Sequence, residues 1–176
     1  MNFNSVIPKN YIQREIEKKI FKFINDKEVI AICGPRQSGK STLLKKIGLF
    51  LQEKYGKESV FFVDFEDEIE KLKFETDPKE YLKFFLRKKN QVFILLDEIQ
   101  YVKESGKILK LLYDHYPQVK FIVSGSSSLD IGKIGQFLVG RVVFFELYPF
   151  SFLEFLKAKD KNLYLEYQEK RFFIDK

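Results

Sequence analysis

The sequence contains one cysteine, one histidine and no tryptophan in 176 residues. A single cysteine cannot form an intramolecular disulfide, which excludes a small secreted scaffold stapled by disulfides. One cysteine and one histidine are also too few for the usual ligand set of a structural zinc site. We therefore expect a domain that is stabilised by its hydrophobic core, for which a chain of this length is large enough.

Long apolar runs are absent as well. No stretch approaches the roughly 18 apolar residues that a membrane-spanning helix needs. The first residues, MNFNSVIPKNYIQREIEKK, become polar and charged at once, and no apolar signal-peptide core is visible. These features predict a cytoplasmic protein with no membrane partner. The formal net charge of +6 leaves nucleic acid open as a partner without requiring it.

Short β-branched or aromatic runs alternate with longer amphipathic patterns, which is typical of α/β proteins with a parallel sheet. The run QVFILLD is the most apolar and indicates a central strand covered on both faces. Strands are expected at 28–33, 59–65, 91–97, 119–124 and 142–147. Helices are expected at 11–25, 40–54, 78–89, about 104–115, about 150–158 and about 162–172, with 125–141 irregular apart from one helical turn. The predicted fold is a three-layer α/β/α domain.

Residues 34–41, GPRQSGKS, match the phosphate-binding P-loop pattern GxxxxGK[ST] between a buried strand and an amphipathic helix. Gly34 and Gly39 would let the backbone curl so that its amides point at phosphate oxygens. Lys40 would place its ammonium against the β- and γ-phosphates, and Ser41 would offer a hydroxyl to Mg²⁺. The predicted nucleotide-binding residues in this segment are Gly34, Pro35, Arg36, Gln37, Ser38, Gly39, Lys40, Ser41 and Thr42.

An acidic pair, Asp97 and Glu98, follows the apolar strand 91–97. An aspartate at the tip of such a strand is typical of a Walker B motif, and we expect Asp97 to hold Mg²⁺ beside Ser41. Glu98 could polarise a water for attack on the γ-phosphate, which makes it the predicted catalytic base. Glu66, near the tip of the strand 59–65, competes with Glu98 for that role.

Two further polar features belong to the same hypothesis. The strand 119–124 ends in SGSSS, where Ser124 or Ser126 could contact the γ-phosphate; a shift of one residue turns a side chain to the other face, so the sequence leaves the register open. Arg141 precedes the last strand and is a candidate arginine finger that acts on the nucleotide of a neighbouring subunit, which implies a homo-oligomer. A surface arginine or a structural ion pair is the alternative interpretation of Arg141.

The segments GPRQSGKSTLL, VDFED, FILLDEIQYV, FIVSGSSSLDI and LVGRVVFFELYPFSFLEF together resemble the archaeal and bacterial ATPases of the AAA+/STAND-like P-loop group. The resemblance covers residues from about 11 to 157. Arg14, in YIQREIE, matches an arginine that such proteins carry upstream of the P-loop.

This resemblance implies a sheet of order 5-1-4-3-2 and an adenine nucleotide, ATP or ADP, as the ligand. It also implies catalytic roles for Lys40 and Glu98, metal binding by Ser41 and Asp97, and a sensor role for Ser126. Relatives carry a further C-terminal domain, so we expect an N-terminal segment at 1–25, an ATPase core at 26–157 and the start of another domain at 158–176.

Two functions remain open from the sequence. The first is Mg²⁺-dependent ATP hydrolysis, which is expected to be slow for this chain alone. The second is a nucleotide-gated switch or binding module with negligible turnover, whose output lies in a further domain or in a nucleic-acid partner. A GTPase is disfavoured because the guanine-reading motif NKxD does not occur.

Overall fold

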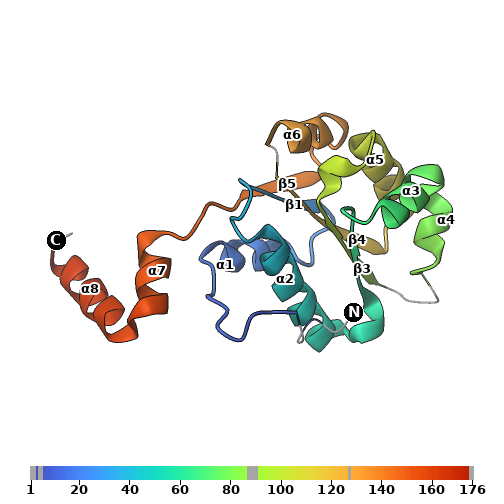
Figure 1. The fold of residues 1–176 in the computed structure, drawn as a ribbon. Coiled ribbons are helices and arrows are strands. Elements are labelled where there is room, and N and C mark those ends of the chain that lie inside the picture. The colour runs from blue at the N-terminus through green and yellow to red at the C-terminus, as the bar shows by residue number, and fades with distance from the viewer. Residues whose placement is uncertain (1–2, 4–5, 87–90, 127, 175–176) are drawn as a thin grey trace.

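Five parallel strands form a single sheet in the computed structural model, which describes residue 3 and residues 6–86, 91–126 and 128–174 (Figure 1). The strands are β1 (Val29–Cys33), β2 (Val60–Asp64), β3 (Val92–Asp97), β4 (Val119–Gly125) and β5 (Val142–Glu146). Their order is β2-β3-β4-β1-β5, which is the predicted order read from the other edge. The predicted order, strand direction and fold class are thus confirmed.

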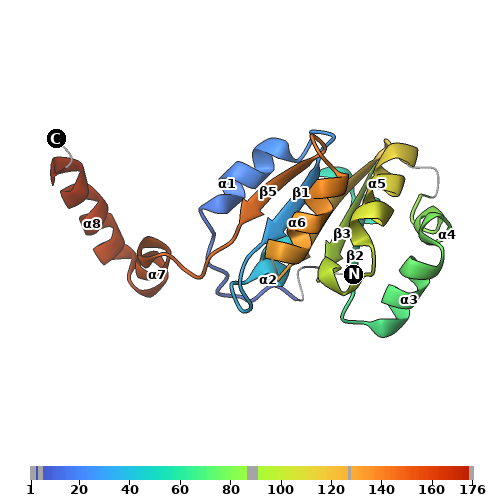
Figure 2. The same cartoon turned by 90° about the horizontal axis from the view of Figure 1, so that it is seen from above.

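Helices cover both faces of the sheet because successive strand residues point to opposite sides. In β1, Val29 and Ala31 belong to one core cluster and Ile30 and Ile32 to the other. The second cluster contains α1 (Ile16–Ile20) and α2 (Lys40–Tyr55), while the first contains α3 (Glu68–Thr76), α4 (Pro78–Lys83), α5 (Ser105–His115) and α6 (Ser128–Phe137). The result is the predicted three-layer arrangement (Figure 2).

The segment 125–141 differs from the prediction, because most of it forms helix α6. Gly132 and Gly135 lower its intrinsic helix propensity, but burial of Ile134 against the sheet outweighs that cost. Gly135 also has a packing role, since a Cβ there would lie 3.1 Å from the ring of Phe144.

Two predicted helices are shorter in the structure, and one helix was not predicted. The helix expected at 11–25 begins only at Ile16, because the amides of Arg14 and Glu15 donate to the side chains of Glu17 and Glu154. Helix α4 ends at Lys83, and the last part of the helix predicted over 78–89 lies outside the described residues. Helix α3 was missed because its apolar positions include the exposed Ile69 and Leu72, so it shows no clear apolar stripe.

Helices α7 (Phe152–Lys159) and α8 (Lys161–Ile174) lie apart from the sheet, at the end of an extended segment that follows β5 (Figures 1 and 2). The predicted domain boundary at 157 falls inside α7 and stays a prediction. Within the described part of the chain, no helix is both long enough and apolar enough to span a membrane.

Candidate functional site

The P-loop leaves the carboxyl end of β1 and leads directly into α2. Gly39 forms the N-cap of α2 with φ of 95°, in the left-handed region that favours glycine. Lys40 is 4% exposed, and its Nζ donates to the carbonyl of Pro35 at 3.0 Å, so the ammonium folds back across the loop. The side-chain oxygen of Ser38 is buried with no hydrogen-bond partner among the described residues. An unpaired buried hydroxyl and a lysine held by a loop carbonyl suit a loop built to receive phosphate.

Gly34 has a packing role at the start of the P-loop. Its φ is positive, at 159°. A Cβ at this position would lie 2.1 Å from the carbonyl oxygen of Leu147, which follows β5. Leu147 donates its own amide to the carbonyl of Cys33 at 2.7 Å. Glycine is thus required because the chain after β5 packs directly against the start of the P-loop.

Asp97, the predicted Walker B aspartate, lies beside Ser41 of the P-loop. Asp97 is 2% exposed, and the hydroxyls of Ser124 and Ser41 donate to its carboxylate. Burial raises the pKa of Asp97, and the two hydroxyl donors act in the opposite direction. A carboxylate and a hydroxyl are the oxygen ligands that Mg²⁺ prefers, with phosphate and water completing its shell. The residues present therefore fit the predicted metal, and β4 presents Ser124 to the same group.

Glu98 lies next to the P-loop and has a strained backbone. Its φ of 53° is left-handed, which is uncommon outside glycine and is often found at functional sites. Its carboxylate accepts a hydrogen bond from Nε2 of Gln100. The same Nε2 lies 3.1 Å from the hydroxyl of Ser126, whose amide donates to Oε1 of Gln100 at 3.3 Å. Ser126 is therefore connected to Glu98 through one amide side chain.

Gln100 was not among the predicted site residues. A signal was present in the sequence, since Gln100 follows Asp97-Glu98 within the motif DEIQ and precedes Tyr101 in a short 3₁₀ turn, η4 (Ile99–Tyr101). What the sequence could not show is that this turn brings the amide to the tip of β4. The two serines that the sequence left open now have distinct neighbours: Ser124 faces Asp97, and Ser126 faces Gln100.

A cavity of about 600 Å³ joins these features. It lies where the P-loop meets the acidic ends of β2 and β3, and its size is in the range of small-molecule sites. Glu66 borders it as well as Glu98, so both candidate bases face the same space. The cavity is lined by Arg36, Gln37, Gly39, Lys40, Ser41, Thr42, Glu66, Glu98 and Tyr101.

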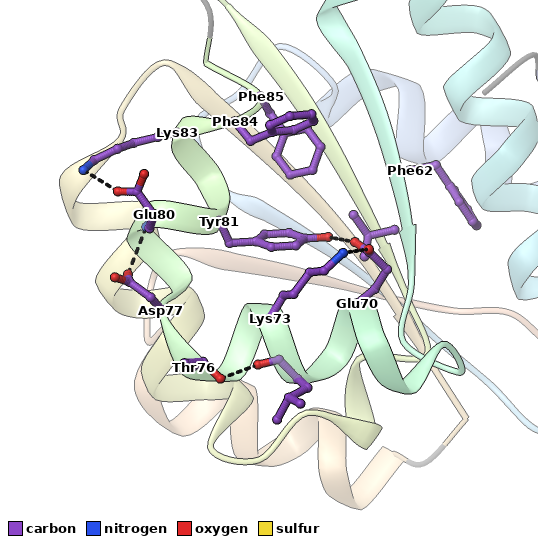
Figure 3. A pocket seen from close by; sticks show the side chains of 12 residues that line it. Phe62, Glu70, Lys73, Thr76, Asp77, Glu80, Tyr81, Lys83, Phe84 and Phe85 are labelled. Carbon is purple, nitrogen blue, oxygen red and sulfur yellow. Dashed lines mark hydrogen bonds and ion pairs between the residues drawn. The ribbon is translucent and has the colours of Figure 1, made fainter.

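A larger cavity of about 940 Å³ lies at β2, α3 and α4, away from the predicted site residues (Figure 3). Glu70 accepts hydrogen bonds from Lys73 and Tyr81, and Glu80 accepts one from Lys83. Among the described residues, these charged and hydroxyl groups of the larger cavity are therefore hydrogen-bonded to one another. The P-loop cavity is therefore the better candidate for chemistry.

Arg141 is not brought to the P-loop of its own chain. Its carbonyl accepts from the amide of Val29 at the amino ends of β5 and β1, whereas the P-loop follows the carboxyl end of β1. Its guanidinium instead pairs with Asp114 at 2.7 Å on the surface. This is the ion pair that the sequence left open as an alternative. The role of Arg141 as a finger toward a second subunit stays a prediction.

The buried ion pair between Arg14 and Glu154 connects the P-loop to α7. Arg14 Nε donates to Glu154 Oε1 at 3.1 Å, and Arg14 Nη1 donates to the carbonyl of Ser38 at 2.9 Å. Burial by itself raises the pKa of Glu154. Bonds from the amides of Ser151 and Glu15 and from Arg14 outweigh burial and leave the pKa below its ordinary value of 4.5.

The Glu154→Gln variant is expected to lower the free energy of unfolding at neutral pH by about 1–3 kcal/mol, because a charged hydrogen-bond acceptor is lost. Since the pKa of Glu154 is lowered on folding, its contribution is present above pH 4.5 and is lost as the pH falls through the lowered value. Urea unfolding of the native chain and of Glu154→Gln at pH 7 and pH 3 measures this contribution. A difference in the free energy of unfolding between the two proteins that is as large at pH 3 as at pH 7 would contradict the expectation.

Comparison with protein families finds a match to a model described as an AAA domain over residues 26–156. An uncharacterized protein of Haemophilus influenzae is 31% identical over 174 residues, which cover 91% of this chain and 42% of the relative. An uncharacterized protein of Methanocaldococcus jannaschii is 33% identical over 157 residues, which cover 89% of this chain and 33% of the relative. The chain thus spans about a third to two fifths of the length of these curated relatives.

Solved structures show the same fold at lower identity. The Aeropyrum pernix ORC1 protein in complex with DNA matches with a TM-score of 0.63 and 11% identity, covering 85% of this chain and 50% of that chain. Domain III of the Thermotoga maritima replication initiation protein DnaA matches with a TM-score of 0.57 and 15% identity, covering 90% of this chain and 73% of that chain. Caenorhabditis elegans PCH-2 matches with a TM-score of 0.56 and 19% identity, covering 93% of this chain and 51% of that chain. At these identities the likeness shows the fold alone.

Proposed function

The chain belongs to the AAA domain family, and on this premise we propose that it is an Mg²⁺-dependent ATPase whose catalytic base is Glu98. One observation carries the proposal: Lys40 and Ser41 after β1 and Glu98 after β3 border a single cavity, with Asp97 bonded to Ser41 beside it. These residues come from separate strands that the parallel sheet brings to the same edge.

Each residue of the site has a separate role in the proposed hydrolysis of ATP. When nucleotide binds, the ammonium of Lys40 exchanges the carbonyl of Pro35 for phosphate oxygens, and the backbone amides of the P-loop donate hydrogen bonds to the other phosphate oxygens. Ser41 and Asp97 are the side chains that would hold Mg²⁺, which when bound neutralises charge on the β- and γ-phosphates. Glu98 takes a proton from the attacking water as the new bond to γ-phosphorus forms, and ADP leaves with the bridging oxygen.

The proposal is tested by equilibrium binding of Mg-ATP, Mg-ADP and Mg-GTP, followed by phosphate release from Mg-ATP over a range of protein concentrations. Adenine nucleotides are expected to bind more tightly than GTP, and phosphate release is expected to be slow. A rate per subunit that rises with protein concentration would support completion of the site between subunits. Absence of nucleotide binding at millimolar concentrations would overturn the proposal.

A second candidate function is a nucleotide-gated switch with negligible turnover. The bond between Glu98 and Gln100 favours it, because it engages the carboxylate that hydrolysis requires, and Gln100 in turn contacts Ser126. A γ-phosphate bound near Ser126 could release or retain Glu98 through this amide. Tight binding of ATP without phosphate release at any protein concentration would favour the switch over the ATPase.

A further inference from the structure

One buried guanidinium joins three segments that are far apart in the sequence. Arg14 is 6% exposed and lies in the segment before α1. Its three nitrogens donate to the carbonyl of Ser38 in the P-loop at 2.9 Å, to the carbonyl of Tyr148 after β5 at 2.6 Å and to Glu154 in α7 at 3.1 Å. Its central carbon also lies 4.5 Å from the ring centre of Phe150. Neither the proposed chemistry nor the hydrophobic core requires this set of contacts.

The contact with Ser38 has a geometric consequence for phosphate binding. The peptide bond between Ser38 and Gly39 is trans, so the carbonyl of Ser38 and the amide N–H of Gly39 point in opposite directions. By holding the carbonyl, Arg14 turns the Gly39 amide away from itself. A Cβ on Gly39 would lie 3.7 Å from Nη1 of Arg14, while Gly39 also borders the P-loop cavity. Arg14 therefore lies behind the loop and the amide faces the phosphate side.

The partner of Arg14 is itself rigidly held. Glu154 is 7% exposed and accepts from the amides of Glu15 and Ser151, each at 2.9 Å. Ser151 accepts from the amide of Glu154 at 3.1 Å, which completes a capping box at the start of α7. The carboxylate is thus fixed by backbone groups on both sides of the contact, and it can fix the guanidinium in turn.

We propose that Arg14 is a positioning residue for the P-loop, which orients the Gly39 amide toward the phosphates of the bound nucleotide, and that Glu154 in α7 holds Arg14 in place. This inference rests on the proposed nucleotide-binding function. It makes the affinity for nucleotide depend on a contact with a helix outside the sheet. A lysine cannot replace the arginine, because one ammonium cannot reach the three acceptors that the planar guanidinium spans.

The test is ADP binding by calorimetry to the native chain and to the Arg14→Lys, Arg14→Gln and Glu154→Gln variants. Both Arg14 variants are expected to bind ADP about 10- to 100-fold more weakly, the range for losing one well-oriented hydrogen bond to a charged group. The affinity of Glu154→Gln for ADP is expected to lie between that of the Arg14 variants and that of the native chain, because Arg14 keeps its two carbonyl acceptors. Should Arg14→Gln fail to fold, Arg14→Lys and Glu154→Gln decide the question.

The Lys120→Met variant is a matched control for stability. Lys120 is another buried cation that joins separate segments, and its Nζ donates to the carbonyls of Phe23, Asp26 and Glu28 at 2.5–2.8 Å. It lies near the amino end of β4, whereas the P-loop follows the carboxyl end of the neighbouring parallel strand β1. Its removal is expected to lower the melting temperature of the chain and to leave the affinity for ADP within about twofold of the native value.

Three results would count against the inference in different ways. Equal ADP affinity in the native chain and in Arg14→Lys would overturn it while leaving the proposed function intact. A loss of affinity in Lys120→Met as large as that in Arg14→Lys would also overturn it, because general destabilisation would then explain both. A native chain that binds no ADP would overturn the proposed function and this inference with it.

Discussion

Replacing Lys40 with alanine is expected to weaken the binding of ATP by about 100-fold or more, since removing one partner of a buried charge pair costs several kcal/mol. The ammonium of Lys40 is buried, it borders the candidate cavity, and the carbonyl of Pro35 is its partner inside the loop. In the proposed site this ammonium contacts the β- and γ-phosphates. The measurement is the dissociation constant for Mg-ATP, determined by calorimetry at constant ionic strength.

Lys54→Ala is the matched control for this experiment. Lys54 lies in the last turn of the same helix, α2, and is exposed. The Lys54→Ala substitution removes the same charge and the same side chain, but far from the P-loop. The affinity of this variant for ATP is therefore expected to equal that of the native chain. If Lys40→Ala bound Mg-ATP within threefold of the native chain, the P-loop would not be the nucleotide site.

The Glu98→Gln variant is expected to retain ATP binding and to lose turnover by about 100- to 10,000-fold, the usual contribution of a general base. Glutamine preserves the size of the side chain and can still contact Gln100, but it cannot accept a proton from water. Single-turnover phosphate release from prebound Mg-ATP separates this effect from any effect on binding. A variant that hydrolyses ATP at the native rate would remove Glu98 from the mechanism.

Glu66→Gln distinguishes the two carboxylates that border the cavity. Glu66 is exposed, whereas Glu98 is half-buried and held by Gln100. We expect Glu66→Gln to change the rate of phosphate release by less than about threefold, because an exposed carboxylate has no fixed orientation toward an attacking water. The opposite result, with turnover lost in Glu66→Gln and retained in Glu98→Gln, would transfer the role of base to Glu66.

The parts of the site that were predictable are those encoded within a few adjacent residues. Gly39 adopts the left-handed conformation that the P-loop pattern requires, and Lys40 begins α2 at the predicted residue. Asp97 ends an entirely buried strand, as its position after an apolar run indicates. Such features depend on local backbone sterics and on hydrophobic patterning, so a single sequence contains enough information to predict them.

Features that depend on contacts between distant segments could not be predicted in this way. Helix α6 contains two glycines and forms because Ile134 is buried against the sheet. The two candidate serines could be distinguished only from the pairing of β4 with its neighbours. This pairing directs Ser124 to Asp97 and leaves Ser126 beside Gln100.

The sequence alone therefore determined the P-loop, the acidic pair, the order of elements and the class of fold, because propensity and periodicity act over short distances along the chain. The contacts between distant side chains were set by the folded arrangement of the strands and helices. Arg14 and Glu154 are 140 residues apart and form a buried ion pair behind the P-loop. Arg141 pairs with Asp114 and lies at the amino ends of β5 and β1, whereas the P-loop follows the carboxyl end of β1. Such partners are brought together by burial and hydrogen bonding in the folded protein. Local sequence patterns do not indicate these contacts, because the partners are far apart along the chain.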